Sequence, residues 1–486
     1  MKRFLSLALA CIMALGLAGT GLAAAEPTTI SVLVRTGDLT PYAAWIETLN
    51  KALLDAGVGV QLKWYSQPSS GYPDFVNNML LTWKADEIYD LIYIQGAAID
   101  ANYLGSMGLL TDMTDLLANS TYAKGVYEAS PILSAQFASC PFQLWPSTVN
   151  RCLQFRSDVL AKCPSYEGFL QSPTIENLTA VLREVKAQGF AGAMTINGID
   201  YLFNTGVDSG FGITSTWMKQ EDGSYRYNRV SDEFLAELTW WADMYKEGVL
   251  SANFATDNWE SMENSLYTSI VAGIGMKGGA YTVYYDTNTV KNFNSEAALT
   301  ILPPAMSADG DQQYNITANR FDRGWVISST CKAPEKAFAV LDYMFSDAGR
   351  KLDLFGLEGT DYTVNADGTY SLIHNSSEIN IYRILDADVF GNIDVPAFTA
   401  GGVPYWPAAS FQSAAMMAKY GVADNDFVIP AEYATNWAAC ETLWREFATQ
   451  FILGEKTTSD WAAYVDTWNS YGGAAVAQYA ASILNK

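Results

Sequence analysis

The chain has 486 residues, of which 49% are hydrophobic, 13% aromatic and 17% charged, with 52 acidic residues against 29 basic ones and a formal net charge of −23. This length is enough for more than one domain with a large core, and the negative charge disfavours binding to the phosphate backbone of nucleic acids. The single histidine, His374, excludes metal sites built from several histidines and leaves a serine-type catalytic triad only one candidate base.

The N-terminus has the pattern of a secretory signal peptide over residues 1–25. Two basic residues precede an apolar stretch at residues 4–22, and three alanines at residues 23–25 form a small-residue cleavage site. A permanent transmembrane helix is the alternative, but glycines interrupt the stretch and no other segment has an apolar run of about 18 residues. Residues 17–20 resemble a lipoprotein box with threonine in place of the essential cysteine. We therefore expect an exported protein, periplasmic or at the cell surface, and the sequence does not support a lipid anchor.

Five cysteines remain after this cleavage, and the chain contains no C-x-x-C motif. An odd number prevents a complete set of disulfides. Cys140 could pair with Cys152 or Cys163 in an oxidising compartment. The alternative is that all five are buried thiols in a large core.

The mature chain begins with strands that alternate with helices. The pattern predicts strands at residues 30–34, 58–65 and 88–94 and helices at residues 42–56 and 72–84. This alternation is typical of a parallel, doubly wound α/β sheet, in which ligands bind beyond the carboxyl ends of the strands. Asp38 follows the strand predicted at residues 30–34, and Gln95 follows the strand predicted at residues 88–94. We therefore predict that both contact a ligand. A turn or helix-capping role ahead of Tyr42 is the alternative for Asp38.

The rest of the chain is richer in helices and has no internal repeat or low-complexity linker. We expect helices at residues 174–189, 232–247 and 334–349 and from about residue 435 to the end, with strands at residues 299–302 and 325–328. Without a flexible tether, the domains should be joined by strands that cross between them.

Six short motifs occur in an order that resembles the family 1 extracellular solute-binding proteins of bacterial ABC importers, the group that contains maltose-binding protein. The segments that carry this resemblance are Phe155-Arg156-Ser157-Asp158, residues 173–178 (PTIENL), residues 245–250 (YKEGVL), residues 273–281 (GIGMKGGAY), residues 324–328 (GWVIS) followed by residues 333–337 (APEKA), and residues 356–362 (GLEGTDY).

This resemblance implies an α/β fold of the two-lobed periplasmic-binding-protein type (type II), with a hinge between the lobes. By analogy, lobe one would comprise residues 28–153 and 292–345, and lobe two residues 154–291 and 346–486. The lobes would close on a ligand, and a membrane permease would read the closed form. The resemblance also implies a protein without enzymatic activity, and we expect a monomer that uses no cofactor or metal.

Sugars have apolar faces that suit aromatic rings and hydroxyl edges that suit polar side chains. The aromatic candidates are therefore those that do not lie on the apolar face of a predicted helix. A role in core packing is the alternative for each of them. They are Tyr72, Trp145, Trp217, Trp259, Tyr281, Tyr405 and Trp406. Asn204, Arg320 and Glu358 are further polar candidates, although Arg320 could instead pair with a surface carboxylate such as Asp322.

No phosphate-binding loop, dinucleotide-binding glycine pattern, nucleophile elbow or EF-hand loop occurs in the sequence. We interpret the protein as a receptor for a carbohydrate, most simply an oligosaccharide, which it delivers to an ABC importer. A secreted glycoside hydrolase is the alternative, because sequence cannot show whether two carboxylates lie about 5–9 Å apart. A receptor for peptides or lipid-linked sugars is a third hypothesis.

Overall fold

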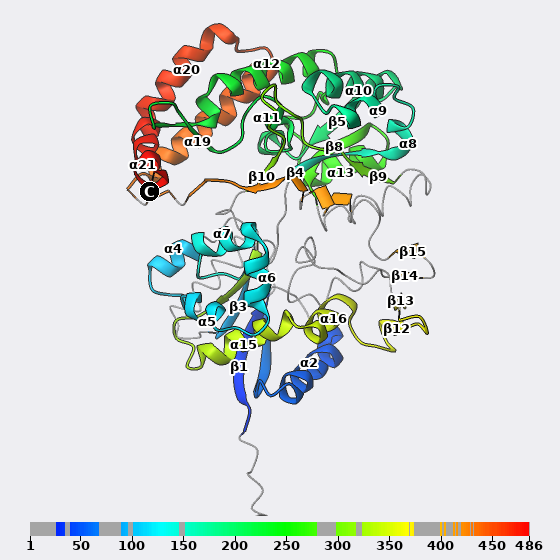
Figure 1. Cartoon of the computed structure of the whole chain (residues 1–486), viewed down its shortest axis with the longest axis vertical. Coiled ribbons are helices and arrows are strands. Elements are labelled where there is room, and N and C mark those ends of the chain that lie inside the picture. The colour runs from blue at the N-terminus through cyan, green and yellow to red at the C-terminus, as the bar shows by residue number, and fades with distance from the viewer. Residues whose placement is uncertain are drawn as a thin grey trace, which may run out of the picture.

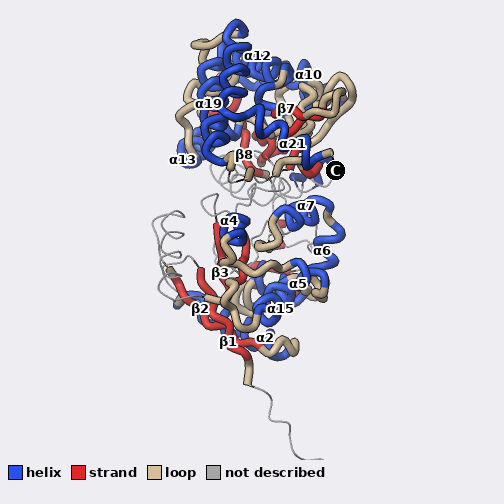
Figure 2. The backbone as a smooth tube through the Cα atoms, turned by 90° about the vertical axis from the view of Figure 1, so that its left-hand side faces the viewer, coloured by secondary structure: helices blue, strands red, loops and turns tan. Residues whose placement is uncertain are grey.

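The structure, a computed structural model, describes residues 26–34, 39–67, 89–95, 101–144, 151–278, 298–316, 323–368, 370–373, 399–400, 403–404, 412–413, 415–416, 419–427, 429–430 and 432–485. These residues form two lobes, each with a four-stranded sheet and helices packed against it (Figure 1). The lobes stay one above the other in a view turned by 90° (Figure 2). Within the described part of the chain, no helix is both long enough and apolar enough to span a lipid bilayer.

The first sheet has the strand order β11-β3-β1-β2. Strands β1 (Thr28–Val34), β2 (Val60–Ser66) and β3 (Leu91–Gln95) run parallel, while β11 (Arg323–Ile327) pairs antiparallel with β3. Helix α2 (Ala43–Asp55) connects β1 to β2. The predicted parallel α/β arrangement is therefore confirmed, with one antiparallel strand added to it.

Both faces of the first sheet are covered by other elements. Side chains alternate between the two faces of a strand, and those on both faces of β1 are buried. Ile30 and Val32 pack into one core cluster, and Leu33 packs into another. The indole N–H of Trp45 donates to the Leu352 carbonyl at 2.9 Å, which links α2 to α16. The helices of this lobe are α4 (Ala101–Ser106), α5 (Thr114–Ala118), α6 (Ala123–Ala129), α7 (Pro131–Ser139), α15 (Pro334–Met344) and α16 (Asp347–Phe355).

The second sheet has the strand order β5-β8-β4-β9. Strands β5 (Gly192–Ile196) and β8 (Val271–Lys277) are parallel, and β4 (Arg151–Arg156) is antiparallel to both β8 and β9 (Leu299–Ile301). Gly273 lies opposite Phe155, and a Cβ atom at position 273 would come within 2.3 Å of the Phe155 ring. The glycine in this strand is therefore required by the close approach of a neighbouring aromatic ring.

Helices form most of the remainder of the second lobe. Thr174 and Ser231 cap α10 and α12 by accepting hydrogen bonds from backbone N–H groups of the first turn. The helices are α8 (Ser157–Leu160), α9 (Tyr166–Gln171), α10 (Ile175–Ala187), α11 (Val207–Gly210), α12 (Asp232–Lys246), α13 (Trp259–Tyr267), α19 (Ala434–Ile452), α20 (Trp461–Trp468) and α21 (Ala474–Leu484). Short strands complete the described elements: β6 (Trp217–Lys219), β7 (Tyr225–Tyr227), β10 (Tyr314–Ile316), β12 (Tyr362–Val364), β13 (Tyr370–Leu372), β14 (Thr399–Ala400), β15 (Val403–Pro404) and β16 (Gly421–Ala423).

The predicted single helix at residues 334–349 is two helices in the structure. Helix α15 ends at Met344, and the Ser346 hydroxyl accepts a hydrogen bond from the Gly349 N–H at 3.1 Å, which starts α16. A serine at a helix N-cap ends one helix and begins the next because its side chain replaces a missing backbone acceptor. The prediction of one continuous helix was wrong for this reason.

Strand pairing favours different lobe ranges from those expected by analogy. Strand β9 pairs with β4 in the second sheet, and Gln412 accepts a hydrogen bond from the Ile301 N–H at 3.1 Å. Phe345 and Leu352 belong to the core of the first lobe. We therefore propose that lobe one comprises the described residues of 28–144 and 323–355, and that lobe two comprises those of 151–316 and 412–485.

The five cysteines in the described part of the chain are buried, and none of them is in a disulfide. Burial raises the pKa of the Cys163, Cys331 and Cys440 thiols to about 11 and raises the pKa of Cys152 further. The structure thus agrees with the hypothesis of buried thiols, and not with a disulfide from Cys140 to Cys152 or Cys163.

Helix α12 carries a glutamate into the core of the second lobe. Glu237 is 0% exposed and accepts a hydrogen bond from the Trp241 indole at 3.3 Å. Burial, followed by the nearby charge of Asp208, raises the pKa of Glu237 well above its usual value, while Arg229 acts in the opposite direction. The Arg229 guanidinium itself is held between aromatic rings, with its Cζ atom 4.6, 4.9 and 5.3 Å from the ring centroids of Phe203, Phe234 and Trp444.

We predict that Glu237→Gln changes how stability depends on pH. A carboxyl with a raised folded-state pKa stabilises the fold below its unfolded pKa, and this stability is lost as the pH rises through the folded pKa. The free energy of unfolding of the wild-type protein should therefore fall by about 1.4 kcal/mol per pH unit between the unfolded and the folded pKa of Glu237. In this range Glu237 is ionised only in the unfolded chain. The variant lacks this loss and keeps an oxygen for the Trp241 indole.

Chemical denaturation of both proteins from about pH 5 to about pH 8 measures this effect. The free energy of unfolding of the variant should rise relative to that of wild type as the pH increases. Parallel curves for the two proteins would contradict a protonated Glu237 in the folded state.

Candidate ligand-binding site

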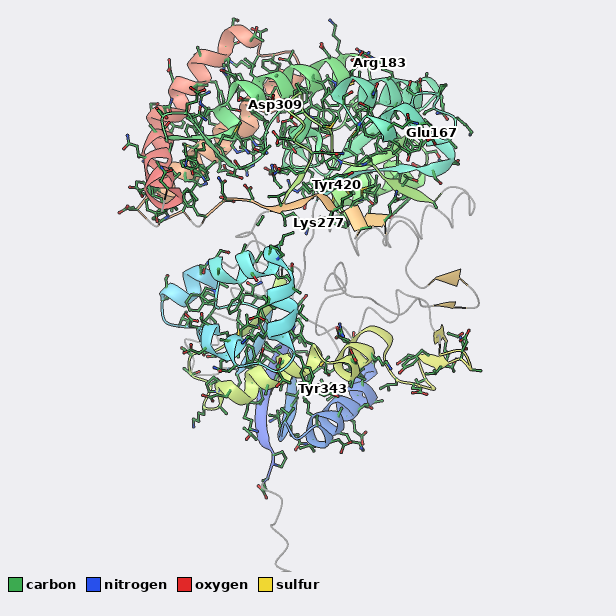
Figure 3. All side chains as sticks on the ribbon, viewed as in Figure 1. Glu167, Arg183, Lys277, Asp309, Tyr343 and Tyr420 are labelled. Carbon is green, nitrogen blue, oxygen red and sulfur yellow. The ribbon has the colours of Figure 1, made fainter. Side chains whose placement is uncertain are left out.

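In each lobe, the sheet edge at the carboxyl ends of the parallel strands faces the other lobe. In the first sheet, the parallel strands end on the side where β11 begins, because Arg323 lies opposite Gln95. In the second sheet, β5 and β8 end where β4 begins, because Arg151 lies opposite Lys277. Figure 3 shows Lys277 on the side of the upper lobe that faces the lower lobe. We call these two borders the lobe-facing edges, and they are where ligands bind in open α/β sheets.

Helix α13 brings an aromatic side chain to the lobe-facing edge of the second sheet. The helix precedes β8 and packs against it, so the N-terminus of α13 lies beside the carboxyl end of β8. The Thr195 hydroxyl donates to the Asp257 carboxylate at 2.5 Å, which joins the start of α13 to the end of β5. Trp259, the first residue of α13, is half-buried and packs with Tyr201 on an apolar cluster that includes Met276.

A glutamate on the same helix orients this tryptophan. Glu263 lies one turn after Trp259 and is hydrogen-bonded to both the Trp259 and the Tyr267 side chains. Burial raises the pKa of Glu263, although these two hydrogen bonds favour its ionised form. Because an oriented ring loses less conformational freedom on binding, this arrangement suits contact with a flat apolar surface.

Arg151 adds a cation next to the second aromatic ring of this edge. Its guanidinium carbon lies 4.1 Å from the Tyr201 ring centroid, and its Nη1 atom donates to the Asp200 carbonyl. The Asp200 carboxylate accepts hydrogen bonds at 2.8 and 3.0 Å from Arg445, and Arg445 also donates to Glu441 at 2.8 Å. The segment that carries Tyr201 is thereby attached to α19.

Two of the predicted site residues lie at the lobe-facing edges. The backbone of Gln95 ends β3 there, as the sequence predicts, and Trp259 lies at the edge of the second sheet. Seven others fall outside the described residues: Asp38, Tyr72, Trp145, Tyr281, Arg320, Tyr405 and Trp406.

Trp217 has a different role from the predicted one, because it is 0% exposed. The Asn425 side chain accepts from its backbone N–H at 2.9 Å and donates to its carbonyl at 2.7 Å. Its ring stacks on Phe427, with the centroids 5.4 Å apart and an interplanar angle of 17°. Trp217 therefore holds residues 425–427 against the second lobe and does not present a face to a ligand.

Asn204 and Glu358 also lie in turns, where their positions do not indicate a ligand contact. Asn204 has a φ of 64°, its N–H donates to the Asp208 carboxylate at 2.7 Å, and its amide oxygen accepts from Arg229 at 3.3 Å. These bonds stabilise a turn, because asparagine tolerates the left-handed region better than most residues. Glu358 is exposed in the turn between α16 and β12, where its backbone bridges to Tyr362.

The sequence analysis did not identify Arg151, Lys277 or Tyr201. The sequence did contain a clue to Arg151 and Lys277. Arg151 lies shortly before the motif at residues 155–158, and Lys277 lies within the motif at residues 273–281. Among the described residues, no group of three or more histidine, cysteine, aspartate or glutamate side chains could hold a metal ion.

The fold has solved counterparts among two-lobed solute-binding proteins, including three that are distant in sequence. An ABC-transporter substrate-binding protein of Streptococcus pneumoniae, FusA, in complex with kestose is 15% identical, with a TM-score of 0.60, covering 94% of this chain and 98% of its own. An HMO-binding solute-binding protein from Bifidobacterium longum infantis is 15% identical, with a TM-score of 0.62 and the same coverage of 94% and 98%. The GacH receptor of Streptomyces glaucescens, solved unliganded and with acarbose, is 13% identical, with a TM-score of 0.55, covering 92% and 98%.

Residues 36–351 match the family of bacterial extracellular solute-binding proteins, and the chain belongs to this family. The resemblance seen in the sequence motifs is thereby confirmed, as is the two-lobed α/β fold that it implies. No curated protein sequence matches the chain significantly.

We predict that Trp217→Ala lowers stability strongly. Replacing a fully buried tryptophan by alanine removes its packing and leaves a cavity, at a cost of about 3–5 kcal/mol. Chemical denaturation should show a loss of unfolding free energy in this range. A loss below about 1 kcal/mol would contradict the core position of this ring.

Proposed function

We propose that this protein is an exported receptor that binds a carbohydrate between its two lobes and presents it to the permease of a bacterial ABC importer. Membership of the solute-binding family supports a binding role in transport. Proteins of the same fold were solved with kestose and with acarbose or are described as HMO-binding, which supports a carbohydrate ligand. We further propose a monomer without affinity for nucleic acid, carried out of the cytoplasm by the N-terminal signal.

The observation that carries this proposal is the set of side chains at the lobe-facing edge of the second sheet. Trp259 and Tyr201 provide aromatic surface, and Arg151 and Lys277 provide hydrogen-bond donors on neighbouring strand ends. Aromatic surface combined with a few polar groups is the composition that small-molecule sites use. A sugar ring has both an apolar face and a hydroxyl edge, so it can use both kinds of group.

Binding between the lobes would also explain how the ligand is sensed. A ligand shifts an open–closed equilibrium only to the extent that it binds the closed form better than the open form. A sugar that contacts Trp259 on the upper lobe and residues near Gln95 on the lower lobe gains its full set of contacts only after closure. The permease would then recognise the closed pair of lobes.

A screen of the purified mature chain against a panel of oligosaccharides tests the receptor function. A ligand that binds only the folded state raises the melting temperature by mass action. Chromatography of the same mixtures should recover each oligosaccharide intact. Release of shorter sugars would contradict the proposal and indicate a glycoside hydrolase, whereas stabilisation by peptides or lipid-linked sugars alone would indicate another ligand class.

We predict that Trp259→Ala weakens binding of the carbohydrate found in that screen by about 1–3 kcal/mol, the range for loss of a stacking aromatic platform. Isothermal titration calorimetry measures this change. Trp240→Ala is the matched control, because Trp240 is also a half-buried tryptophan of the second lobe but lies on α12, where its indole donates to Thr179 at 2.8 Å. Equal losses of affinity in the two variants would argue against a direct contact by Trp259.

A further inference from the structure

The first lobe contains buried polar side-chain atoms that no other group of the protein satisfies. Among the described residues of this lobe, the three such atoms are Trp64 Nε1, Gln67 Oε1 and Gln136 Oε1. A buried donor or acceptor without a partner destabilises a fold, and native proteins keep few of them. Each of these atoms therefore needs a physical explanation.

Two of the atoms belong to side chains that pack between elements of the protein itself. The Trp64 ring packs on the core of the first lobe and stands edge-on to the Trp325 ring, with the centroids 6.5 Å apart. Gln136 is buried on α7, one turn after Ile132, and Ile132 packs against Ile316 of the second lobe. Their positions assign both side chains to packing, one within the first lobe and one where the two lobes meet.

Gln67 has a different position, because it follows the last residue of a parallel strand. Ser66 ends β2, and the Gln67 N–H donates to the carbonyl of Val34, at the end of β1, at 3.0 Å. This bond holds the residue at the lobe-facing edge of the first sheet, where ligands bind in open α/β sheets. The side chain is half-buried and its Oε1 atom is fully buried, yet in the part of the chain that the structure describes no group donates to this oxygen.

We propose that Gln67 is a ligand-contacting residue of the first lobe, and that its side-chain oxygen accepts a hydrogen bond from a hydroxyl group of the carbohydrate. This inference rests on the proposed carbohydrate-binding function and adds a contact on the lobe opposite Trp259. A hydroxyl group can donate to the oxygen that the protein leaves without a donor. A site that binds one particular hydroxyl rejects analogues that lack it, so Gln67 would contribute to the choice of sugar.

Thermal unfolding without any ligand is the first test. Gln67→Met removes the amide group and keeps a side chain of similar length. Because no hydrogen bond within the protein is lost, the melting temperature should stay within about 1 °C of wild type or rise. Gln61→Met is the matched control, since Gln61 is an exposed residue near the other end of the same strand. A melting temperature more than about 2 °C below that of the control would reveal a partner within the protein and overturn the inference.

Calorimetry with the oligosaccharide that gives the largest thermal shift in the screen is the second test. Gln67→Met should weaken its binding about tenfold, and Gln61→Met should leave it unchanged. Gln67→Glu keeps an acceptor oxygen, so it should bind this oligosaccharide more tightly than Gln67→Met does. One monodeoxy derivative of the oligosaccharide should bind wild type about tenfold more weakly and Gln67→Met no more weakly than the parent sugar, because both changes remove the same hydrogen bond.

The outcomes separate the contact from the proposed function. Wild-type affinity in Gln67→Met would overturn the inference and leave the proposed function intact. The same holds if every deoxy derivative weakens binding to Gln67→Met as much as it weakens binding to wild type. Binding of no oligosaccharide in the screen would overturn the proposed function together with the inference.

Discussion

The chain passes from one sheet to the other and back. The direction of the strand that follows each passage determines which edge of the sheet that strand starts from. Each of the strands β4 and β11 is the first described element after a crossing, and each pairs antiparallel with a strand of its sheet. An antiparallel strand begins where its parallel neighbours end. Both strands therefore begin on the same side of their sheet as the carboxyl ends of the parallel strands. Strand direction alone thus places the starts of β4 and β11 at the lobe-facing edges, which are suited to a ligand.

The aromatic residues of the chain divide between two tasks. Many pack in the second lobe, where Tyr227 stacks on Trp468 with an interplanar angle of 7° and Phe447 stacks on Tyr464 with centroids 4.2 Å apart. These contacts join α19 and α20 to the body of the lobe. Trp259 differs because it begins a helix at the edge of a sheet and is only half-buried. The composition alone could not separate the two groups.

The sequence predicted the fold well where the signal was local. The strand predicted at residues 30–34 and the helices predicted at residues 42–56, 174–189 and 232–247 all correspond to observed elements. The position of Gln95 at a strand end was also predictable, because it follows from a parallel sheet. Tryptophan roles were not predictable in the same way. The neighbours that bury Trp217 include Asn425, Phe427 and Trp437, about 200 residues further along the chain, and no local pattern shows that they meet.

The buried thiols have a practical consequence for measuring how the lobes move. Thiolates are the reactive form of cysteine, and thiols with raised pKa values inside a core react slowly with maleimides at neutral pH. Cys140, Cys152, Cys163, Cys331 and Cys440 are all buried, and burial raises the pKa of the last four. A cysteine introduced on the surface of each lobe would consequently take up a fluorophore without prior removal of the native ones. The distance between two such labels could then be followed by energy transfer in otherwise unaltered protein.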